Sequence, residues 1–460
     1  MSGNRNVVVV GAGMAGLGAA YTLRKHGLDV TVFEASPDIG GRVTGKQIDG
    51  FHMDVGANVF LESYGTIRQL ASELGVSLKR TPVPINGGVY RSGRFHGFYG
   101  GGSPASQLKT AGTFLQFRLL SPRGLRQALR FVKMLKARAN DLSFDDHRRI
   151  LDLDTGVSTT EFFESNFGTE VLERFIQPTL SSYTLGYPEE VGAAYAMVAA
   201  WDFGLNAGAW PCLPDGGPGV FVNALARACA ERGGGIRVST PVDRIVLEDG
   251  AVRGVVTEAG FVEADAVVCA TTATKALEII PRLPSGIRDV LRRVTYSKCC
   301  RVFFGVDSSP FPTDWYAVAF PRETGALMTG MSDSAVLAPE TVPEGRALVD
   351  ALVIGKRAEE LFGLSDEEAS QQVLAEIRDY FPTMARPLFT HVHRWDEAVC
   401  LAPGGMMTAL DRMRGQDLAD VRGLFLAGEY MGVPSTNGAL RSGIDTAEDC
   451  AAFFSQPAGR

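Results

Sequence analysis

Three glycines and one glutamate near the start of the chain have the spacing of a dinucleotide-binding turn. Gly11, Gly13 and Gly16 follow the apolar run at residues 7–10, and Glu34 closes the next apolar segment. In such a turn the first glycine permits the tight bend, the second admits a pyrophosphate, and the third lets the next helix pack closely. A carboxylate about 20 residues further on can accept hydrogen bonds from an adenosine ribose. The spacing therefore predicts a site for NAD or FAD.

The segments around this turn are those of a parallel α/β layer. Residues 7–10 are all valine, which is typical of a strand buried on both faces. A helix is expected from the turn to about Gly27, followed by a second strand, "DVTVFEA", that ends at Glu34. The start of the helix would present N–H groups and a positive dipole end to the phosphates. This order of elements disfavours the alternative of a purely structural glycine turn.

Two segments after the turn decide between the two cofactors. Residues 34–45 read "EASPDIGGRVTG", and residues 49–60 read "DGFHMDVGANVF". With the turn, they resemble the FAD-binding amine oxidase superfamily, which includes monoamine oxidases, protoporphyrinogen oxidases and carotenoid-type desaturases. The resemblance implies that Gly40, Gly41 and Arg42 contact the flavin side of a non-covalently bound FAD. Small residues let a chain lie flat on a cofactor, and an arginine offers a charged fork, although a surface salt bridge is the alternative for Arg42.

A stretch near the far end of the chain completes the resemblance. Residues 426–450, "LAGEYMGVPSTNGALRSGIDTAEDC", read as a strand, a loop and a helix. By resemblance, Gly428 and Glu429 reach the ribitol and pyrophosphate, and N–H groups at Ala439 and Leu440 stabilise negative charge on reduced flavin. The full set of expected FAD-binding residues is Gly11, Gly13, Met14, Ala15, Gly16, Glu34, Ala35, Gly40, Gly41, Arg42, Gly56, Ala57, Val242, Gly428, Glu429, Gly438, Ala439 and Leu440.

The resemblance also implies the domain organisation. We expect an α/β fold with a discontinuous, Rossmann-like FAD-binding domain formed by residues 1–85, 215–295 and 390–460. An inserted α+β substrate domain, with a mixed sheet and helices, would comprise residues 86–214 and 296–389. Within it, Ser158 and Glu161 have the spacing of a helix capping box. Residues 120–140 form a candidate basic amphipathic helix, for which a solvent-facing role is favoured over membrane association.

Composition excludes several other classes of protein. A net charge of −7 without a basic block argues against nucleic-acid binding. No segment approaches the roughly 20 apolar residues of a membrane span. Seven scattered cysteines without a CxxC pair suit reduced thiols, so a cytoplasmic protein is the default expectation. His391 and His393 could share a strand face, but two nitrogens without nearby cysteines or carboxylates do not predict a metal site.

The expected activity is that of an FAD-dependent oxidoreductase. A bound flavin supplies the hydride-accepting chemistry, so no catalytic residue is assigned from the sequence. There is no second dinucleotide turn, which leaves oxygen or another acceptor to take the electrons. The substrate would be a small, largely hydrophobic organic molecule in an apolar pocket. Aromatic candidates for its lining are Tyr183, Tyr187, Trp210, Tyr316, Trp395 and Tyr430.

Departures from the family patterns leave the oxidised bond open. By alignment, Arg301 or Val302 stands near the lysine of amine oxidases, with Lys298 out of register, and Ser435 replaces an aromatic residue. Cys400 replaces a proline of protoporphyrinogen oxidases, and a packing role is favoured over a covalent flavin link. A desaturase-like or protoporphyrinogen oxidase-like activity is therefore the leading hypothesis. The alternatives are an amine or amino-acid oxidase that releases hydrogen peroxide, and a non-catalytic flavin-binding protein.

Overall fold

The parallel sheet predicted around the first turn is formed by segments from three distant parts of the chain. The computed structural model describes residues 5–100, 103–116, 120–312 and 314–455. In this sheet β1 (Asn6–Val10) lies centrally, and every pairing is parallel. Its neighbours, in sheet order, are β10 (Gly235–Arg237) and β2 (Asp29–Phe33) on one side and β14 (Ala266–Cys269) and β20 (Leu424–Leu426) on the other.

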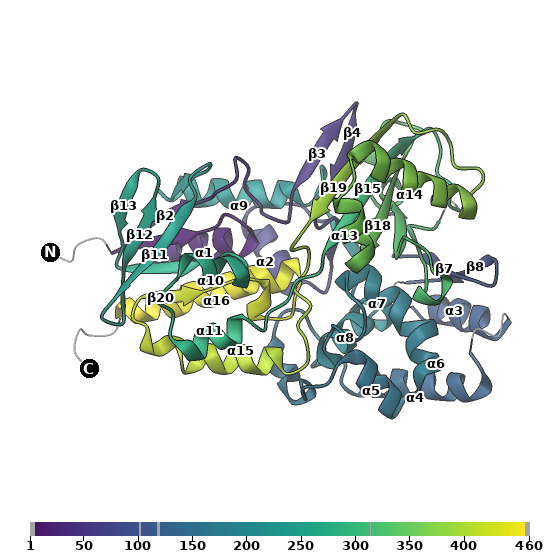
Figure 1. Cartoon of the computed structure of the whole chain (residues 1–460), viewed down its shortest axis with the longest axis horizontal. Coiled ribbons are helices and arrows are strands. Elements are labelled where there is room, and N and C mark those ends of the chain that lie inside the picture. The colour runs from purple at the N-terminus through teal and green to yellow at the C-terminus, as the bar shows by residue number, and fades with distance from the viewer. Residues whose placement is uncertain (1–4, 101–102, 117–119, 313, 456–460) are drawn as a thin grey trace.

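Helices cover this sheet at very close range. Helix α1 (Met14–Lys25) packs on α16 (Thr436–Ser455) because glycines stand at the contact: an added Cβ at Gly443 would lie 2.0 Å from the Ala15 carbonyl oxygen. The other helices of this part are α2 (Gly65–Glu73), α9 (Gly219–Glu231), α10 (Ala273–Ile279), α11 (Ser285–Leu291) and α15 (Met406–Gly415). A meander of β11 (Val242–Glu248), β12 (Ala251–Thr257) and β13 (Gly260–Glu263) lies beside them. Figure 1 shows this part at one end of the long axis.

A second, mixed sheet occupies the other end. Its seven strands, in sheet order, are β19 (Phe389–Trp395), β15 (Cys299–Val306), β18 (Ala347–Ile354), β17 (Gly330–Asp333), β16 (Ala317–Ala319), β7 (Gly87–Arg91) and β8 (Arg94–Phe98). Only the β16–β7 pairing is parallel. Because β19 pairs with β15, the boundary expected at residue 390 cuts a strand of this sheet. The predicted combination of a discontinuous parallel layer and a mixed second sheet is confirmed.

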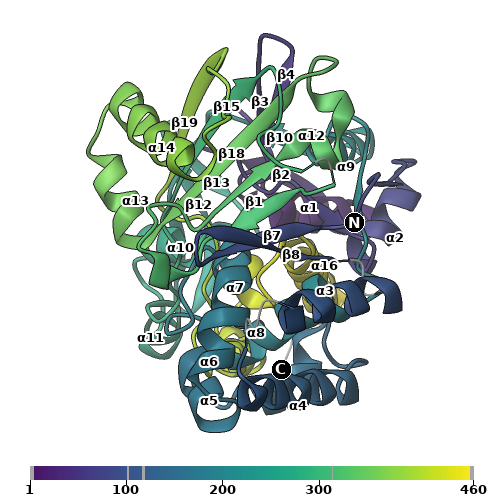
Figure 2. The same ribbon diagram turned by 90° about the vertical axis from the view of Figure 1, so that its right-hand side faces the viewer.

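Helices from the first half of the chain lie next to the mixed sheet. They are α3 (Pro104–Gln116), α4 (Pro122–Ala137), α5 (Thr159–Asn166), α6 (Thr169–Val171), α7 (Gln177–Thr184) and α8 (Ala193–Ala200), and Figure 2 shows them below β7 and β8. Helices α13 (Gly355–Phe362) and α14 (Asp366–Tyr380) pack with apolar residues of β15 and β18, and α12 (Ser334–Leu337) follows β17. The capping box at Ser158 and Glu161 is present at the start of α5.

Short strands connect the two parts. The hairpin of β3 (Gly45–Ile48) and β4 (Phe51–Asp54) follows the parallel layer, and β9 (Pro211–Leu213) pairs with β5 (Phe60–Leu61) and β6 (Lys79–Arg80). The basic segment forms the amphipathic helix α4, with Phe131 and Leu135 buried and its basic side chains mainly on the exposed face. Among the described residues, no helix has the length and apolar character needed to cross a membrane.

Candidate cofactor and substrate site

One large cavity joins the two parts of the molecule. It has a volume of about 1120 Å³ and is lined by residues from the parallel layer, the mixed sheet and helices α7 and α8. Most of the expected FAD-binding residues lie along its wall: Gly11, Gly13, Met14, Ala15, Glu34, Ala35, Gly40, Gly41, Arg42, Gly56, Ala57, Val242, Gly428, Glu429 and Ala439. The fold therefore brings together segments that are more than 400 residues apart in the sequence.

The first glycine turn has the backbone geometry that its spacing predicts. Gly11 adopts a φ of +102°, and its N–H group donates to the Phe33 carbonyl at 2.8 Å. At Gly16 an added Cβ would lie 1.9 Å from the Gly11 carbonyl oxygen, so this glycine lets helix and turn pack together. At Gly13, which lines the cavity, the nearest atom to an added Cβ is the Gly40 carbonyl oxygen at 3.9 Å. Gly13 thus keeps open a space in which a ligand can lie against the backbone.

Glu34 is held in place by the turn itself. Its two carboxylate oxygens accept hydrogen bonds from the N–H groups of Ala12, at 2.7 Å, and Ser36, at 2.8 Å. Glu34 follows β2 at the carboxyl edge of the parallel sheet, where ligands of such sheets bind. Each oxygen retains a lone pair for a further donor, so the carboxylate suits a ribose diol.

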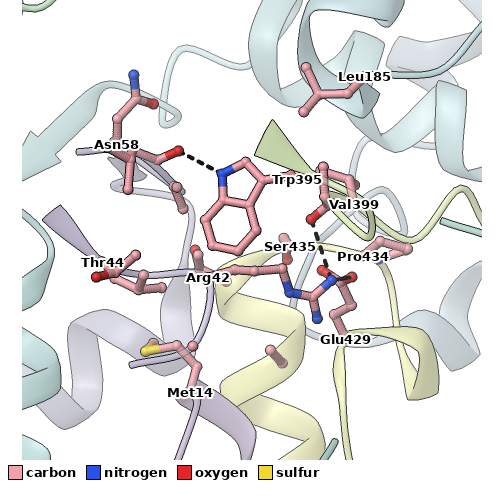
Figure 3. A pocket seen from close by; sticks show the side chains of 18 of the residues that line it. Met14, Arg42, Thr44, Asn58, Leu185, Trp395, Val399, Glu429, Pro434 and Ser435 are labelled. Carbon is pink, nitrogen blue, oxygen red and sulfur yellow. Dashed lines mark hydrogen bonds and ion pairs between the residues drawn. The ribbon is translucent and has the colours of Figure 1, made fainter. Parts of the chain in front are cut away.

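Arg42 and Glu429 form an ion pair in the cavity wall. The Nη1 atom of Arg42 donates to Glu429 Oε1 at 2.5 Å and to the Ala398 carbonyl at 3.3 Å, and Figure 3 shows the two side chains pointing toward each other. Burial alone would lower the pKa of Arg42, but the Glu429 carboxylate, together with Tyr296 and Cys400, raises the pKa overall. Within the described residues, Nε and Nη2 of Arg42 have no hydrogen-bond partner. Arg42 therefore keeps N–H groups for an anionic ligand.

These features fit FAD. The open space at Gly13, the carboxylate of Glu34 and the unspent donors of Arg42 lie in one cavity, as the phosphates and ribose of a dinucleotide require. The same cavity continues along residues of the mixed sheet and of helices α7 and α8.

Neutral side chains dominate the part of the cavity formed by the mixed sheet. Tyr183 on α7 stacks on Phe203 with ring centroids 3.6 Å apart. Phe203 lies in a π-helical turn, Trp201–Leu205, that directly follows α8. Trp395 donates from Nε1 to the Val55 carbonyl at 2.8 Å, and Asn58 donates to the Tyr316 hydroxyl at 2.9 Å. Burial raises the pKa of Tyr183 and of Tyr316, so both hydroxyls stay protonated.

Two ionisable residues, His393 in β19 and Lys298 just before β15, differ in their position relative to the cavity. Burial lowers the pKa of His393 to about 4, and the charges of Lys46, His391 and Arg301 act in the same direction. His393 is therefore neutral at physiological pH. Lys298 is not in the cavity wall, because its ammonium group forms surface ion pairs with Glu359 and Asp396.

Arg301, rather than a lysine, faces the cavity from β15. Its guanidinium pairs with the carboxylate of Asp350 on the neighbouring strand β18. Both side chains are buried, and each is the only charged residue of an otherwise apolar strand, "CCRVFFGV" and "ALVDALVI". A lone charge in such a strand is the sequence signal for a buried pair.

Three expected cofactor residues do not line the cavity. Gly16 contributes packing instead, as described above. At Gly438 the N–H group donates to Ser435 Oγ at 2.8 Å, and Leu440 is fully buried against Gly18 of α1. The N–H group of Ala439 donates to the Ser435 carbonyl at 2.9 Å, so it is not free for a flavin. The expected role of the Ala439 N–H group is corrected accordingly, and that of the Leu440 N–H group stays a prediction.

Three aromatic candidates also lie outside the cavity wall. Trp210 precedes β9 and donates from Nε1 to the Thr81 carbonyl at 3.1 Å. Tyr187 packs against the backbone of Gly355, and Tyr430 is buried against Gly428. Tyr183, Tyr316 and Trp395 do line the cavity, together with Phe203, Asn58 and Thr44, which the sequence reading missed.

Cys400 has a packing role in this structure. The residue is fully buried and does not line the cavity, and its N–H group donates to Glu429 Oε1 at 2.9 Å. Burial raises the pKa of its thiol well above the usual range. Among the described residues there is also no cluster of three metal-ligating side chains.

Comparisons with known proteins agree with this geometry. Residues 14–451 match the family model of flavin containing amine oxidoreductases. The mitochondrial protoporphyrinogen oxidase of Nicotiana tabacum is 24% identical over 97% of this chain and 95% of its own length. A zeta-carotene-forming phytoene desaturase of Myxococcus xanthus is 30% identical over 58% of this chain and 53% of its own length.

A solved structure shows the same fold over the whole molecule. It is from Exiguobacterium sp. 255-15, is provisionally named a protoporphyrinogen oxidase, and covers 99% of this chain and 100% of its own. The TM-score is 0.77 at 21% identity. At that identity the likeness shows the fold alone.

Proposed function

The chain belongs to the flavin-containing amine oxidoreductases, and from this premise we propose that it oxidises an uncharged, largely apolar organic substrate. It is an FAD-dependent oxidoreductase of the protoporphyrinogen oxidase and desaturase type.

One observation carries the proposal: the walls that the mixed sheet, α7 and α8 give to the cavity offer no uncompensated charge. The charged side chains of Lys46, Asp396 and Glu397 line the cavity from β3 and from the segment after β19. Among the described lining residues from β7, β8, β15–β19, α7, α8 and the Trp201–Leu205 turn, the charged side chains are Arg301 and Asp350. They neutralise each other, and His393 is neutral. A charged substrate group entering this space would lose its hydration without gaining a partner. The portion of the substrate that enters is therefore uncharged.

In the proposed complex, the protein binds and orients both partners. Bound FAD supplies the capacity to accept hydride from a C–H bond next to nitrogen or to an unsaturated system. Glu34 would hold the adenosine ribose, and Arg42 would use its unspent N–H groups on the pyrophosphate or flavin oxygens. The Tyr183–Phe203 pair and Trp395 would shape the apolar space and exclude water. The electrons would pass to oxygen or another acceptor.

The amine oxidase alternative has less support from the site. Arg301 or Val302 stands near the position of the amine oxidase lysine, and Arg301 is paired with Asp350. Ser435 lies in the cavity wall, where an aromatic residue would guide an amine. A cationic amine would also meet the neutral wall described above.

Anaerobic reduction of the flavin tests the substrate class. The FAD-loaded protein is mixed with a neutral polyene, with a porphyrinogen as free acid and as methyl ester, and with an aliphatic amine, while flavin absorbance is followed. We expect bleaching by the polyene or the porphyrinogen ester, a slower reaction with the free acid, and none with the amine. Bleaching by the amine alone would contradict the proposal. Failure of all four reductants would favour the non-catalytic alternative.

A further inference from the structure

Arg301 is unusual among the cavity-lining residues because its hydrogen-bonding capacity is almost fully used within the protein. Only 7% of its side chain is exposed, and only 1% of the Asp350 side chain. Nε donates to the two carboxylate oxygens of Asp350 at 3.2 and 3.3 Å, and Nη2 also donates to Asp350. The charge of the guanidinium is thus compensated on one side.

The other side of the guanidinium forms hydrogen bonds with the backbone of a segment that is distant in the sequence. Nη1 donates to the carbonyl oxygens of Asp54, at 2.8 Å, and Gly56, at 2.5 Å. With one N–H on Nε, two on Nη1 and one on Nη2 engaged, a single N–H group of Arg301 remains. Asp54 ends β4 and Gly56 follows in the connection between the two parts, so Arg301 ties the mixed sheet to that connection.

The same segment is bonded in turn to the glycine–arginine turn of the cofactor region. The N–H group of Ala57 donates to the Arg42 carbonyl at 2.9 Å, and that of Gly56 to the Thr44 carbonyl at 3.4 Å. The contact is so close that an added Cβ at Gly56 would lie 2.0 Å from the Arg42 carbonyl oxygen. Residues 54–57 are therefore fixed from two sides, by Arg301 and by the backbone of residues 42–44.

A lysine could not reproduce this arrangement. Its ammonium is a point charge with three donors, whereas the planar guanidinium serves a carboxylate and two carbonyl oxygens in different directions at once. Nor is Arg301 suited to bind an anionic substrate, because Asp350 neutralises it and a single N–H group is left. Its bonds instead indicate a role exerted through residues 54–57.

We propose that Arg301, held by Asp350, is a positioning residue that fixes the Asp54–Gly56 backbone and thereby the cavity wall at Gly56–Asn58 against which FAD lies. This inference rests on the proposed FAD site for its functional consequence. Asn58 extends the effect into the substrate part, because its amide donates to the Tyr316 hydroxyl.

The test compares two arginines on paired strands. Arg301→Lys removes the fork in the cavity wall, while Arg394→Lys makes the same change on β19, where Arg394 binds Asp366 and the Leu364 carbonyl outside the cavity. Hydrogen exchange of residues 54–58, visible circular dichroism of bound FAD, and the FAD dissociation constant are measured for both. Loss of these bonds should weaken FAD binding about tenfold. We also expect faster exchange and an altered flavin signal for Arg301→Lys, and no change in any of the three for Arg394→Lys.

A double variant separates positioning from stability. Replacing Arg301 by Met and Asp350 by Leu removes the clamp without leaving a buried charge unpaired, an exchange that is often neutral or stabilising. We expect a thermal midpoint at or above that of the wild type, together with faster exchange at residues 54–58 and weaker FAD binding. Wild-type exchange, flavin signal and FAD affinity in this variant would overturn the proposal. If the wild type bound no FAD, the proposed function would fail. Hydrogen exchange of residues 54–58 in the wild type and in the double variant would still test whether Arg301 fixes this backbone.

Discussion

The cavity contains two arginine–carboxylate pairs, one in each part of the molecule, and they differ in what they leave unused. In the cofactor part, Arg42 pairs with Glu429 through Nη1, and their side chains are 29% and 10% exposed. In the mixed sheet, Arg301 and Asp350 are 7% and 1% exposed, and almost every guanidinium N–H has an acceptor in the protein.

This difference separates a binding arginine from a positioning arginine. Both guanidinium groups line the same cavity, so location alone does not distinguish them. The number of free N–H groups does distinguish them, because a guanidinium whose N–H groups already have acceptors gains little from a ligand. Arg42 is therefore expected to act on FAD directly, and Arg301 through the backbone that it holds.

The largest effect should follow from breaking the deeper pair. Asp350→Leu leaves the Arg301 charge buried without a partner, and we expect the free energy of unfolding to fall by about 3–5 kcal/mol. Glu429→Gln, which keeps an acceptor oxygen in the more exposed pair, should cost about 1–2 kcal/mol. Urea denaturation of the two variants measures both losses. Equal losses would remove the distinction between the pairs.

A pair of glycines provides the same contrast in the first turn. Gly13→Ala adds a methyl group at the cavity wall, where the nearest protein atom is 3.9 Å away, so the fold should lose less than about 1 kcal/mol. FAD affinity should fall about 100-fold, because the backbone can no longer approach the pyrophosphate. Titration of apoprotein with FAD measures this change. Gly16→Ala is the structural control. Its Cβ would meet the Gly11 carbonyl oxygen at 1.9 Å, so the free energy of unfolding should fall more in this variant than in Gly13→Ala.

Arg42→Lys should have a smaller effect, confined to binding. The lysine keeps a positive charge for Glu429 but loses the planar fork, so we expect an FAD affinity about tenfold lower and a nearly unchanged thermal midpoint. The FAD dissociation constant and thermal unfolding are measured together. A variant that loses stability but binds FAD normally would show that Arg42 stabilises the fold and does not bind FAD.

The smallest effect concerns pH. The folded-state pKa of His393, about 4, lies below the ordinary value of 6.5, so the unfolded chain binds a proton more readily. The resulting contribution to stability is present above pH 6.5 and is lost as pH falls from 6.5 toward 4. His393→Asn should flatten the decline of unfolding free energy across this window by a small amount, because the ring is partly exposed. Identical pH profiles for variant and wild type would show that His393 titrates normally.

Local sequence predicted the elements that hold the cofactor, because their signals are local. A valine strand, a glycine turn and a following helix specify one another over a few residues, and the resemblance at the far end supplied Gly428 and Glu429. Which N–H groups at the start of α16 remain free for a ligand could not be predicted in this way. It depends on how the Ser435 side chain and carbonyl turn back onto the first helical residues.

The substrate part was harder to predict because tertiary pairing decides which side chains face inward. Trp210 turns toward Thr81, while Phe203 reaches the cavity from a π-helical turn that periodicity does not reveal. Likewise, Arg301 and Asp350 are 49 residues apart and meet only through the pairing of β15 with β18. Their lone charges in apolar strands were visible, but their partners were not.

The visible absorption spectrum of the purified protein, recorded before and after denaturation, tests the central claim most directly. We predict flavin bands in the native protein and their complete release into the supernatant on denaturation, with about one FAD per chain. A colourless protein that binds NAD instead would contradict the assignment of Gly13, Glu34 and Arg42 to FAD.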